Sequence, residues 1–214
     1  MDLSNQREQY SKEILRKVTL DENPFEQFAH WFETARNSEI PEPNAFSLAT
    51  ASANAAPSVR TVLLKYFDES GFVFFTNYQS HKALDIDENP QVAMCFPWIA
   101  LERQIIIRGS AAKIPVATSL KYFLSRPRNS QLGAWVSDQS QIISSRKILE
   151  MKLHEIKKRF ADRDITLPPT WGGYRIKPSA FEFWQGGADR LHDRFLYTQR
   201  EEGSNTWSIE RLSP

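Results

Sequence analysis

The chain begins with a polar stretch that leads into one clearly marked amphipathic helix. Asn23 can cap this helix, Pro24 suits its first position, and Glu26 stands at the capping-box position. Apolar residues then recur at helical spacing, at positions 25, 28, 29, 32 and 35. Because two prolines lie within residues 40–44, the pattern predicts a helix that starts at Pro24 and ends at this loop.

Between residues 45 and 114 the pattern changes to short β-branched and aromatic runs separated by turn residues. These runs predict five strands, over residues 45–52, 58–67, 71–77, 91–98 and 102–114. Residues 68–71 predict a hairpin turn. The one interruption, at residues 80–90, predicts a short helix that Ser80 caps and that ends before Pro90.

The rest of the chain predicts two more helices and further strands. One helix covers Val116–Ser125 and is ended by Pro127, and a second covers residues 145–160 with one apolar face. A Pro/Gly loop at residues 167–173 precedes strand segments at 174–178, 180–184, 193–199 and 206–212. Because no strand–helix alternation is present, this order predicts an α+β fold, an antiparallel β-barrel with helices outside it.

Length, composition and charge narrow the class of protein. The 214 residues, 41% of them hydrophobic, fit a single domain, expected over residues 21–214 after a flexible N-terminal segment at residues 1–20. A formal net charge of +1 gives no global field for nucleic acid or a membrane surface. The N-terminus has no apolar signal core, and no run approaches the roughly 20 apolar residues of a membrane span. A cytoplasmic protein is therefore expected.

Motifs that would bring their own chemistry are missing from the sequence. It contains no glycine-rich dinucleotide loop, no Walker loop and no nucleophile elbow. The four histidines are scattered, and no Cys/His or Glu/His spacing predicts a metal site. If the chain is an enzyme, a bound organic cofactor is expected to carry the difficult step.

Two basic clusters in the strand region predict anion binding. Arg60 and Lys65 lie in one apolar run, where cations rarely occur without an anionic partner; the alternative is a strand with solvated ends. Strict alternation places them on opposite faces, unless a bulge or a subunit interface brings both to one site. His81 and Lys82 stand at a helix start, which favours phosphate, although cations are common at such positions.

A third cluster lies in the last part of the helix predicted over Val116–Ser125 and in the residues that follow it. Tyr122 and Arg126 are four residues apart and share a helix face, and Ser130 can turn back toward them after Pro127. A phenol, a guanidinium and a hydroxyl that converge on one point suit a phosphate monoester. The alternative is a charged helix end on the surface, because basic residues favour helix C-termini.

The fourth cluster is residues 183–194, in which a Gly-Gly turn separates Trp184 from three potential cations. In a strand after the turn, Arg190, His192 and Arg194 have the same parity and project to one face. Anions or π systems opposite them would relieve their repulsion, and Trp184 could stack on a planar ring. The alternative is a surface hairpin. We predict that this segment helps close a site for phosphorylated, planar aromatic molecules.

Several segments resemble one family along essentially the whole chain, from residue 7 to residue 214. They are RTVLLK, FFTN followed by SHKA, LERQ, KYFLSRPRNSQLGAWVS and FWQGGADRLHDRFLY, which resemble the pyridoxine (pyridoxamine) 5′-phosphate oxidase family. The resemblance implies an antiparallel Greek-key FMN-binding split β-barrel with surrounding helices, working as a homodimer with FMN at the subunit interface. It also implies oxidation of pyridoxine or pyridoxamine 5′-phosphate to pyridoxal 5′-phosphate. Molecular oxygen would be the acceptor, with release of hydrogen peroxide and, from the amine, ammonia.

The resemblance also implies roles for individual residues, without a metal, nucleic acid or membrane. Expected FMN contacts are Arg60, Thr61, Val62, Leu63, Leu64, Lys65, Phe75, Thr76, His81, Lys82, Gln104, Gln139, Ser140, Trp184 and Arg194. Expected substrate contacts are Arg7, Tyr10, Lys65, Tyr122, Arg126, Ser130, Arg190 and His192. Of these, Arg190 is the catalytic candidate for orienting the ring and stabilising developing charge, and His192 for orienting the substrate or assisting proton movement.

Two positions depart from the family pattern. His81 stands where the family usually has arginine, which predicts a weaker or pH-dependent grip on the FMN phosphate, and Phe75 stands where tyrosine is common. Two other functions stay open. A different split-barrel flavoenzyme would lack the Tyr122, Arg126 and Ser130 set and would consume a nicotinamide. A carrier would bind pyridoxal phosphate without turning it over.

Overall fold

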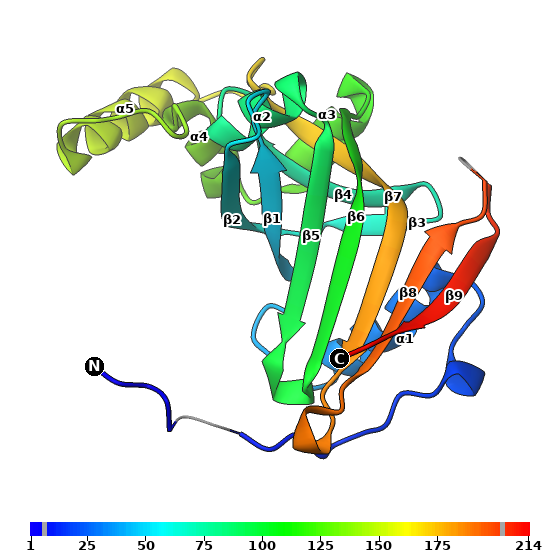
Figure 1. The fold of residues 1–214 in the computed structure, drawn as a ribbon. Helices are drawn as coiled ribbons and strands as arrows, with labels where there is room; N and C mark the ends of the chain where they lie inside the picture. Colours follow the sequence, from blue (N-terminus) through cyan, green and yellow to red (C-terminus); the bar gives the residue numbers. More distant parts are fainter. Residues whose placement is uncertain (6–7, 202–203) are drawn as a thin grey trace.

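The structure is a computed structural model that describes residues 1–5, 8–201 and 204–214 (Figure 1). Its described strands form one antiparallel sheet in the order β2-β1-β5-β6-β7-β4-β3. In addition, β8 pairs with β7, and β9 pairs with β8. The strands are β1 (Ala45–Ala51), β2 (Pro57–Leu63), β3 (Tyr66–Asp68), β4 (Gly71–Asn77), β5 (Gln91–Trp98), β6 (Arg103–Lys113), β7 (Trp171–Gln185), β8 (Asp193–Gln199) and β9 (Trp207–Leu212).

The described helices are α1 (Pro24–Arg36), α2 (His81–Glu88), α3 (Val116–Ser125), α4 (Arg128–Val136) and α5 (Arg146–Arg159), with short 3-10 turns η1 (Lys17–Thr19), η2 (Ile99–Leu101) and η3 (Ala188–Arg190). Helices α2, α3 and α4 gather at one end of the sheet, and α5 projects away from it (Figure 1). Within the described ranges, none of these helices has the length and apolar character needed to cross a membrane.

Strand β7 is where the sheet divides. One edge of β7 pairs with β6, whereas on the other edge its first half pairs with β4 and its second half with β8. The register with β6 shifts at Gly109, where a Cβ atom would lie 2.1 Å from the carbonyl oxygen of Lys177. Such an irregularity bends a strand, and β3 and β4 run across β5 and β6 in Figure 1. The expected antiparallel barrel with helices outside it is confirmed.

Helix α1 covers the sheet with aromatic side chains. Phe28 is fully buried, and its ring centroid lies 4.9 Å from that of Phe72 and 5.2 Å from that of Phe96. The predicted cap is confirmed, because the Asn23 side chain accepts a hydrogen bond from the backbone N–H of Phe25 at 2.9 Å. The helix is thus held by its cap at one end and by edge-to-face ring contacts along its buried face.

Three sequence predictions were wrong in detail. The strand expected at residues 58–67 is two strands, because buried Leu64 turns the chain into the core between β2 and β3. Helix α4 was missed, since Pro127 both ends α3 and occupies the N-cap position of α4. The expected loop at residues 167–173 gives up its last three residues to β7, where Gly172 and Gly173 pair with β4.

The first twenty residues contact the sheet at several points. The backbone N–H groups of Ser11 and Lys12 donate to a carboxylate oxygen of Glu102 at 2.9 and 3.0 Å. Leu15 is buried, and its N–H donates to Asp193 at 3.0 Å. The predicted flexibility of residues 1–20 stays a prediction, but these contacts tie residues 11–15 to one end of the sheet.

Replacing Phe28 with alanine is expected to lower the free energy of unfolding by about 3–5 kcal/mol, because the cavity left among packed rings cannot collapse fully. Urea unfolding followed by tryptophan fluorescence at a fixed protein concentration measures this change. Ile99→Ala is the matched control: Ile99 is 75% exposed, so its loss should change the same free energy by only about 0.5 kcal/mol. Equal effects of the two substitutions would contradict the assigned role of Phe28.

Candidate functional site

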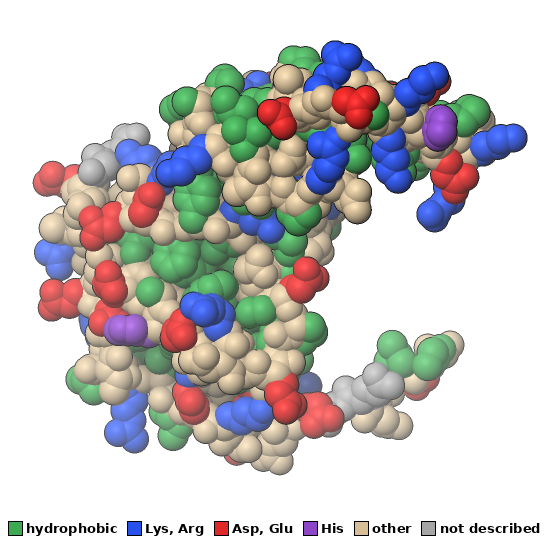
Figure 2. All heavy atoms as spheres, turned by 180° about the vertical axis from the view of Figure 1, so that it is seen from behind, with side chains coloured by type: hydrophobic (Ala, Val, Ile, Leu, Met, Phe, Trp, Pro, Cys, Tyr) green, Lys and Arg blue, Asp and Glu red, His purple; other side chains and the backbone are tan. Residues whose placement is uncertain are grey.

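A cavity of 860 Å³ lies where the start of α2, the end of α3 and the start of α4 meet strands β2 and β4. Most residues expected from the sequence to bind FMN or a phosphate line it together. They are Arg60, Thr61, Val62, Leu63, Lys65, Phe75, Thr76, His81, Lys82, Tyr122, Arg126, Ser130, Gln139 and Ser140. The molecule is hollowed on the side between the α5 arm and the N-terminus (Figure 2).

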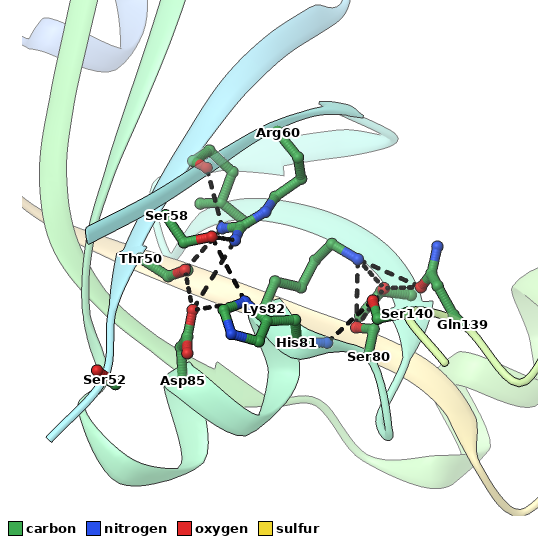
Figure 3. A network of polar contacts seen from close by, with 12 residues as sticks. Thr50, Ser52, Ser58, Arg60, Ser80, His81, Lys82, Asp85, Gln139 and Ser140 are labelled. Atoms are coloured by element: carbon green, nitrogen blue, oxygen red, sulfur yellow. Dashed lines mark hydrogen bonds and ion pairs between the residues drawn. The ribbon is translucent and has the colours of Figure 1, made fainter. Parts of the chain in front are cut away.

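Arg60 and Lys82 form a first pair of cations at this cavity (Figure 3). Lys82 is only 6% exposed, and its ammonium donates to the oxygens of Thr76, Ser80 and Gln139 at 3.1–3.2 Å. These partners are neutral. Burial, and next the positive charge of Arg60, lower the pKa of Lys82 to about 8. An anion at this point would therefore stabilise the protonated lysine.

The start of α2 differs from its prediction in one respect. Ser80 occupies the N-cap position with extended backbone angles, but its hydroxyl makes no capping hydrogen bond and instead accepts one from the Lys82 ammonium. The backbone N–H of His81 donates to the Ser140 hydroxyl at 3.2 Å. Ser80 thus helps to position the lysine rather than to cap the helix.

Lys65 and Arg126 form a second pair of cations in the same cavity. Burial, and then the charge of Arg126, lower the pKa of Lys65, and burial lowers the pKa of Arg126. The Nη1 atom of Arg126 is buried without a hydrogen-bond partner in the described part of the chain. A buried guanidinium N–H without an acceptor is costly, so this group also favours an anionic ligand.

An aromatic stack stands beside the second pair. The ring of Phe75 is nearly parallel to those of Tyr122 and Trp171, at centroid distances of 4.1 and 5.2 Å. The Arg126 guanidinium lies 4.8 Å from the centroid of the Trp171 ring. Trp171 was missed because its segment was assigned to a loop; an aromatic residue before two glycines was the only sequence signal. The stack gives the cavity a flat, apolar wall next to its charges.

Strict alternation, which would place Arg60 and Lys65 on opposite faces, does not hold between these two residues. Both side chains line the 860 Å³ cavity, because β2 ends at Leu63 and strict alternation ends with it. Leu64 does not line the cavity but is 4% exposed in the core. The backbone N–H of Lys65 donates to the carbonyl of Val73 at 2.9 Å, which fixes the turn that redirects its side chain.

The other predicted site residues form a separate tail cluster at the far end of the sheet from α2 and α4 (Figure 1). Gln104, Trp184 and Arg194 are cross-strand neighbours on β6, β7 and β8. The Trp184 ring contacts those of Tyr10 and His192 at centroid distances of 5.8 and 4.8 Å. Beside them lies an 800 Å³ cavity lined by Glu8, Gln9, Tyr10, Gly187, Asp189, Arg190 and His192.

The common face predicted for Arg190, His192 and Arg194 was wrong. Strand β8 begins only at Asp193, and Arg190 has a left-handed backbone with a φ of 64° in η3. The Arg194 guanidinium is paired with Glu182 of its own chain at 2.8 Å. His192 Nδ1 accepts a hydrogen bond from the Gly187 N–H at 3.1 Å. A turn of only two glycines would have kept the alternation of side chains in residues 190–194. The turn is longer and includes η3, so the alternation begins only with β8.

Two further outcomes complete the placement of the predicted residues. Arg7 lies outside the described residues. In the ranges that are described, no group of His, Cys, Asp and Glu side chains could hold a metal ion. The cavity and the tail cluster share no lining residue, so one chain brings the predicted residues together in two places rather than one.

Comparison with known proteins decides the family. The pyridoxamine 5′-phosphate oxidase model matches residues 32–160, and the model of the pyridoxine 5′-phosphate oxidase C-terminal dimerisation region matches residues 171–214. A pyridoxine/pyridoxamine 5′-phosphate oxidase of Crocosphaera subtropica is 60% identical over 214 residues, with both chains covered completely. The chain belongs to the pyridoxine/pyridoxamine 5′-phosphate oxidase family. A family member of the same name from Aliarcobacter butzleri is 58% identical over the same length.

Solved structures agree on the fold. PhzG from Burkholderia lata, in complex with tetrahydrophenazine-1-carboxylic acid, has a TM-score of 0.87 at 26% identity, covering 94% of this chain and 98% of that one. A pyridoxamine 5′-phosphate oxidase-related, FMN-binding protein from Nostoc punctiforme has a TM-score of 0.70 at 18% identity with the same coverage. The second likeness concerns the fold alone. Together they confirm the split-barrel fold expected for this family.

The lowered pKa of Lys82 predicts how the stability of the FMN-free protein depends on pH. Between about pH 8 and 10.5 the unfolded chain binds more protons at this residue than the folded chain, so the free energy of unfolding should rise with pH in this window. The rise, relative to Lys82→Gln, should be on the order of 3 kcal/mol at 1.4 kcal/mol per pKa unit. Denaturant unfolding at pH values across the window measures it. Lys147→Gln, at an exposed lysine, should leave the rise intact, and a rise of the same size in Lys82→Gln and the wild type would refute the assignment.

Proposed function

We propose that this chain is an FMN-dependent oxidase that acts in the cytoplasm and converts pyridoxine or pyridoxamine 5′-phosphate to pyridoxal 5′-phosphate. The observation that carries the proposal is one cavity with two pairs of partly buried, mutually repelling cations beside an aromatic stack. Each pair suits one phosphate group, so the cavity suits two phosphorylated molecules at once. The names of the full-length relatives, at about 60% identity, support the same substrates.

The first pair of cations fits the phosphate of FMN. Lys82 is buried among neutral oxygens, and Arg60 beside it adds a second positive charge that a phosphate would neutralise. The N-terminus of α2 contributes the positive end of a helix dipole at the same place. The proposed contacts from this chain's cavity are Arg60, Thr61, Val62, Leu63, Leu64, Lys65, Phe75, Thr76, His81, Lys82, Gln139 and Ser140. Leu64 would act through its backbone, since its side chain is buried in the core.

The second pair fits the phosphate of the substrate. Arg126 Nη1 is buried without an acceptor in the described residues, and Lys65 is close enough for its pKa to be lowered by Arg126. Tyr122 and Ser130 line the same part of the cavity and would add hydroxyl donors. A phosphate between Lys65 and Arg126 would accept a hydrogen bond from the buried Nη1 of Arg126. It would also relieve the repulsion between the two cations.

The site is proposed to be completed by a second copy of the chain. The family model that matches residues 171–214 is described as a dimerisation region, which supports a homodimer. Within one chain the cavity and the tail cluster lie at opposite ends of the sheet (Figure 1). In a two-fold dimer the tail cluster of each subunit would face the cavity of the other. FMN would then also contact Gln104, Trp184 and Arg194 of the partner subunit, and lie in the interface.

The tail cluster offers groups that can hold and orient a substrate ring. His192 Nδ1 accepts a hydrogen bond from the backbone, so the neutral imidazole carries its proton on Nε2 and presents a donor. This tautomer favours orientation of the substrate over removal of its proton. Arg190 is held in a left-handed turn next to His192, and the Tyr10 ring packs against the imidazole ring of His192. We propose that Arg190 stabilises charge that develops on the ring during oxidation.

The proposed reaction balances with molecular oxygen. The alcohol loses two hydrogens at its C4′ group, and oxygen becomes hydrogen peroxide; the amine additionally consumes one water and releases ammonia. FMN would supply the two-electron acceptor that oxygen reoxidises. The residues of the chain supply binding and position, which can account for much of the rate.

Peroxide release from the purified FMN-loaded protein and pyridoxine 5′-phosphate tests the proposal. A carrier would hold pyridoxal phosphate without releasing peroxide, and a different split-barrel flavoenzyme would require a nicotinamide. Either result would overturn the proposal.

Replacing Arg126 with alanine is expected to raise KM for pyridoxine 5′-phosphate by roughly 10- to 100-fold, because a charge-assisted contact with the phosphate is lost. The affinity for FMN should change little. Steady-state peroxide assays give KM, and flavin fluorescence gives the FMN affinity. Arg163→Ala, at an exposed arginine, is the control and should behave as the wild type. An unchanged KM in Arg126→Ala would remove this residue from the proposed phosphate site.

Mixing two impaired variants should restore activity at low substrate concentration if the site is shared between subunits. Arg126→Ala damages the cavity and Arg190→Ala damages the tail cluster, so each mixed dimer would contain one intact site and one doubly altered site. After unfolding and refolding together, about a quarter of the wild-type activity should return, because half of randomly assorted dimers are mixed. The two variants refolded separately and then combined are the control. No recovery in the co-refolded sample would place each site within a single chain.

A further inference from the structure

Asp85 is a buried carboxylate directly behind the first pair of cations (Figure 3). It belongs to α2, is 4% exposed, and does not line the cavity. Its Oδ2 atom accepts a hydrogen bond from the Thr50 hydroxyl at 2.6 Å, and lies 3.6 Å from His81 Nδ1 and 3.8 Å from Arg60 Nη2. A carboxylate this deeply buried is costly unless its partners compensate it, so these three contacts explain its presence.

Thr50 transmits the effect of Asp85 to Arg60. A hydroxyl has one proton, and the Thr50 proton goes to Asp85; its lone pairs are therefore available to Arg60 Nη1, which donates to it at 2.6 Å. Arg60 also donates to the carbonyl of Leu48 at 3.2 Å and to the Ser58 hydroxyl at 2.6 Å. The guanidinium is thus fixed on its inner side, and the charge of Asp85 opposes the lowering of the Arg60 pKa by burial.

His81 lies between Asp85 and the cavity. Its side chain is 65% exposed, lines the cavity, and has Nδ1 at 3.4 Å from the Ser58 hydroxyl. Among the described residues, its ring lies against the carboxylate of Asp85, four residues further along the same helix, and against the neutral hydroxyl of Ser58. A charged imidazole would pair with Asp85 and add a third cation to the phosphate end, and a neutral one would not.

We propose that Asp85 is a positioning residue for the FMN phosphate: it fixes Arg60 through Thr50 and holds His81 beside the same phosphate. The inference rests on the proposed FMN site.

Asp85→Asn separates positioning from simple charge. Asparagine keeps the size of the side chain but removes its negative charge. If Asp85 acted only as an anion near a phosphate, its removal would tighten FMN binding. If it positions Arg60 and His81, FMN binding should weaken on the order of tenfold, the loss expected for misplaced charge-assisted hydrogen bonds. The sign of the change therefore decides between the two.

The test compares FMN with riboflavin, which lacks the phosphate. Dissociation constants for the FMN-free protein are measured by quenching of flavin fluorescence at one fixed pH. In Asp85→Asn the affinity for FMN should fall while that for riboflavin stays, whereas general damage to the fold would weaken both. Asp87→Asn on the same helix, which removes an ion pair with Lys113, is the control and should change neither.

The outcomes distinguish this inference from the proposed function. Wild-type protein that binds FMN no more tightly than riboflavin would overturn both. If the wild type binds FMN tightly and Asp85→Asn binds it equally tightly or more tightly, the inference alone is overturned. If Asp85→Asn does not fold, Thr50→Val carries the test, because it removes the hydroxyl between Asp85 and Arg60 at similar size. It should also weaken FMN selectively, and an unchanged ratio of FMN to riboflavin affinity would refute the link.

Discussion

Repulsion between partly buried cations is the constraint on which the rest of this structure depends. Lys82 lies beside Arg60, and Lys65 beside Arg126, in one cavity. Neutral oxygens, an aromatic stack and one buried carboxylate hold these charges in place before any ligand arrives. Folding thus carries an electrostatic cost that an anionic ligand relieves, and a preorganised site loses little of its binding energy to rearrangement.

The fold gathers these cations by bringing the ends of several helices and strands to one place. The start of α2, the end of α3 and the start of α4 surround the cavity, and β2 ends there after Leu63. Lys65, Lys82 and Arg126 lie at or next to the ends of elements, so they can reach inward without interrupting a strand or a helix, whereas Arg60 lies within β2. The ring contacts of α1 and the division of β7 between β4 and β8 keep the sheet curled. The helices and strands around the cavity therefore keep their positions relative to one another.

The tail cluster answers a different requirement. Its aromatic rings pack against one another, and Arg194 forms an ion pair with Glu182 of the same chain. Arg190 and His192, however, border an open 800 Å³ cavity that lies far from the cavity with the two pairs of cations. The proposed homodimer would join the two and would explain why one chain carries both halves at opposite ends. In that arrangement FMN and substrate would be enclosed by two subunits, and dimer formation would itself assemble the site.

The sequence by itself determined most elements, the antiparallel class and the residues that gather in the cavity, because apolar periodicity, turn residues and isolated cations are local signals. It predicted Tyr122, Arg126 and Ser130 as one set, and the cavity brings them together. It failed where distant contacts decide: the break at Leu64, the turn at Arg190 and the stacking of Trp171. It also left Asp85 unnoticed, since a carboxylate on a short helix is ordinary until the fold buries it between Thr50, Arg60 and His81. Only the tertiary structure supplies that burial, because it comes from strands far away along the chain.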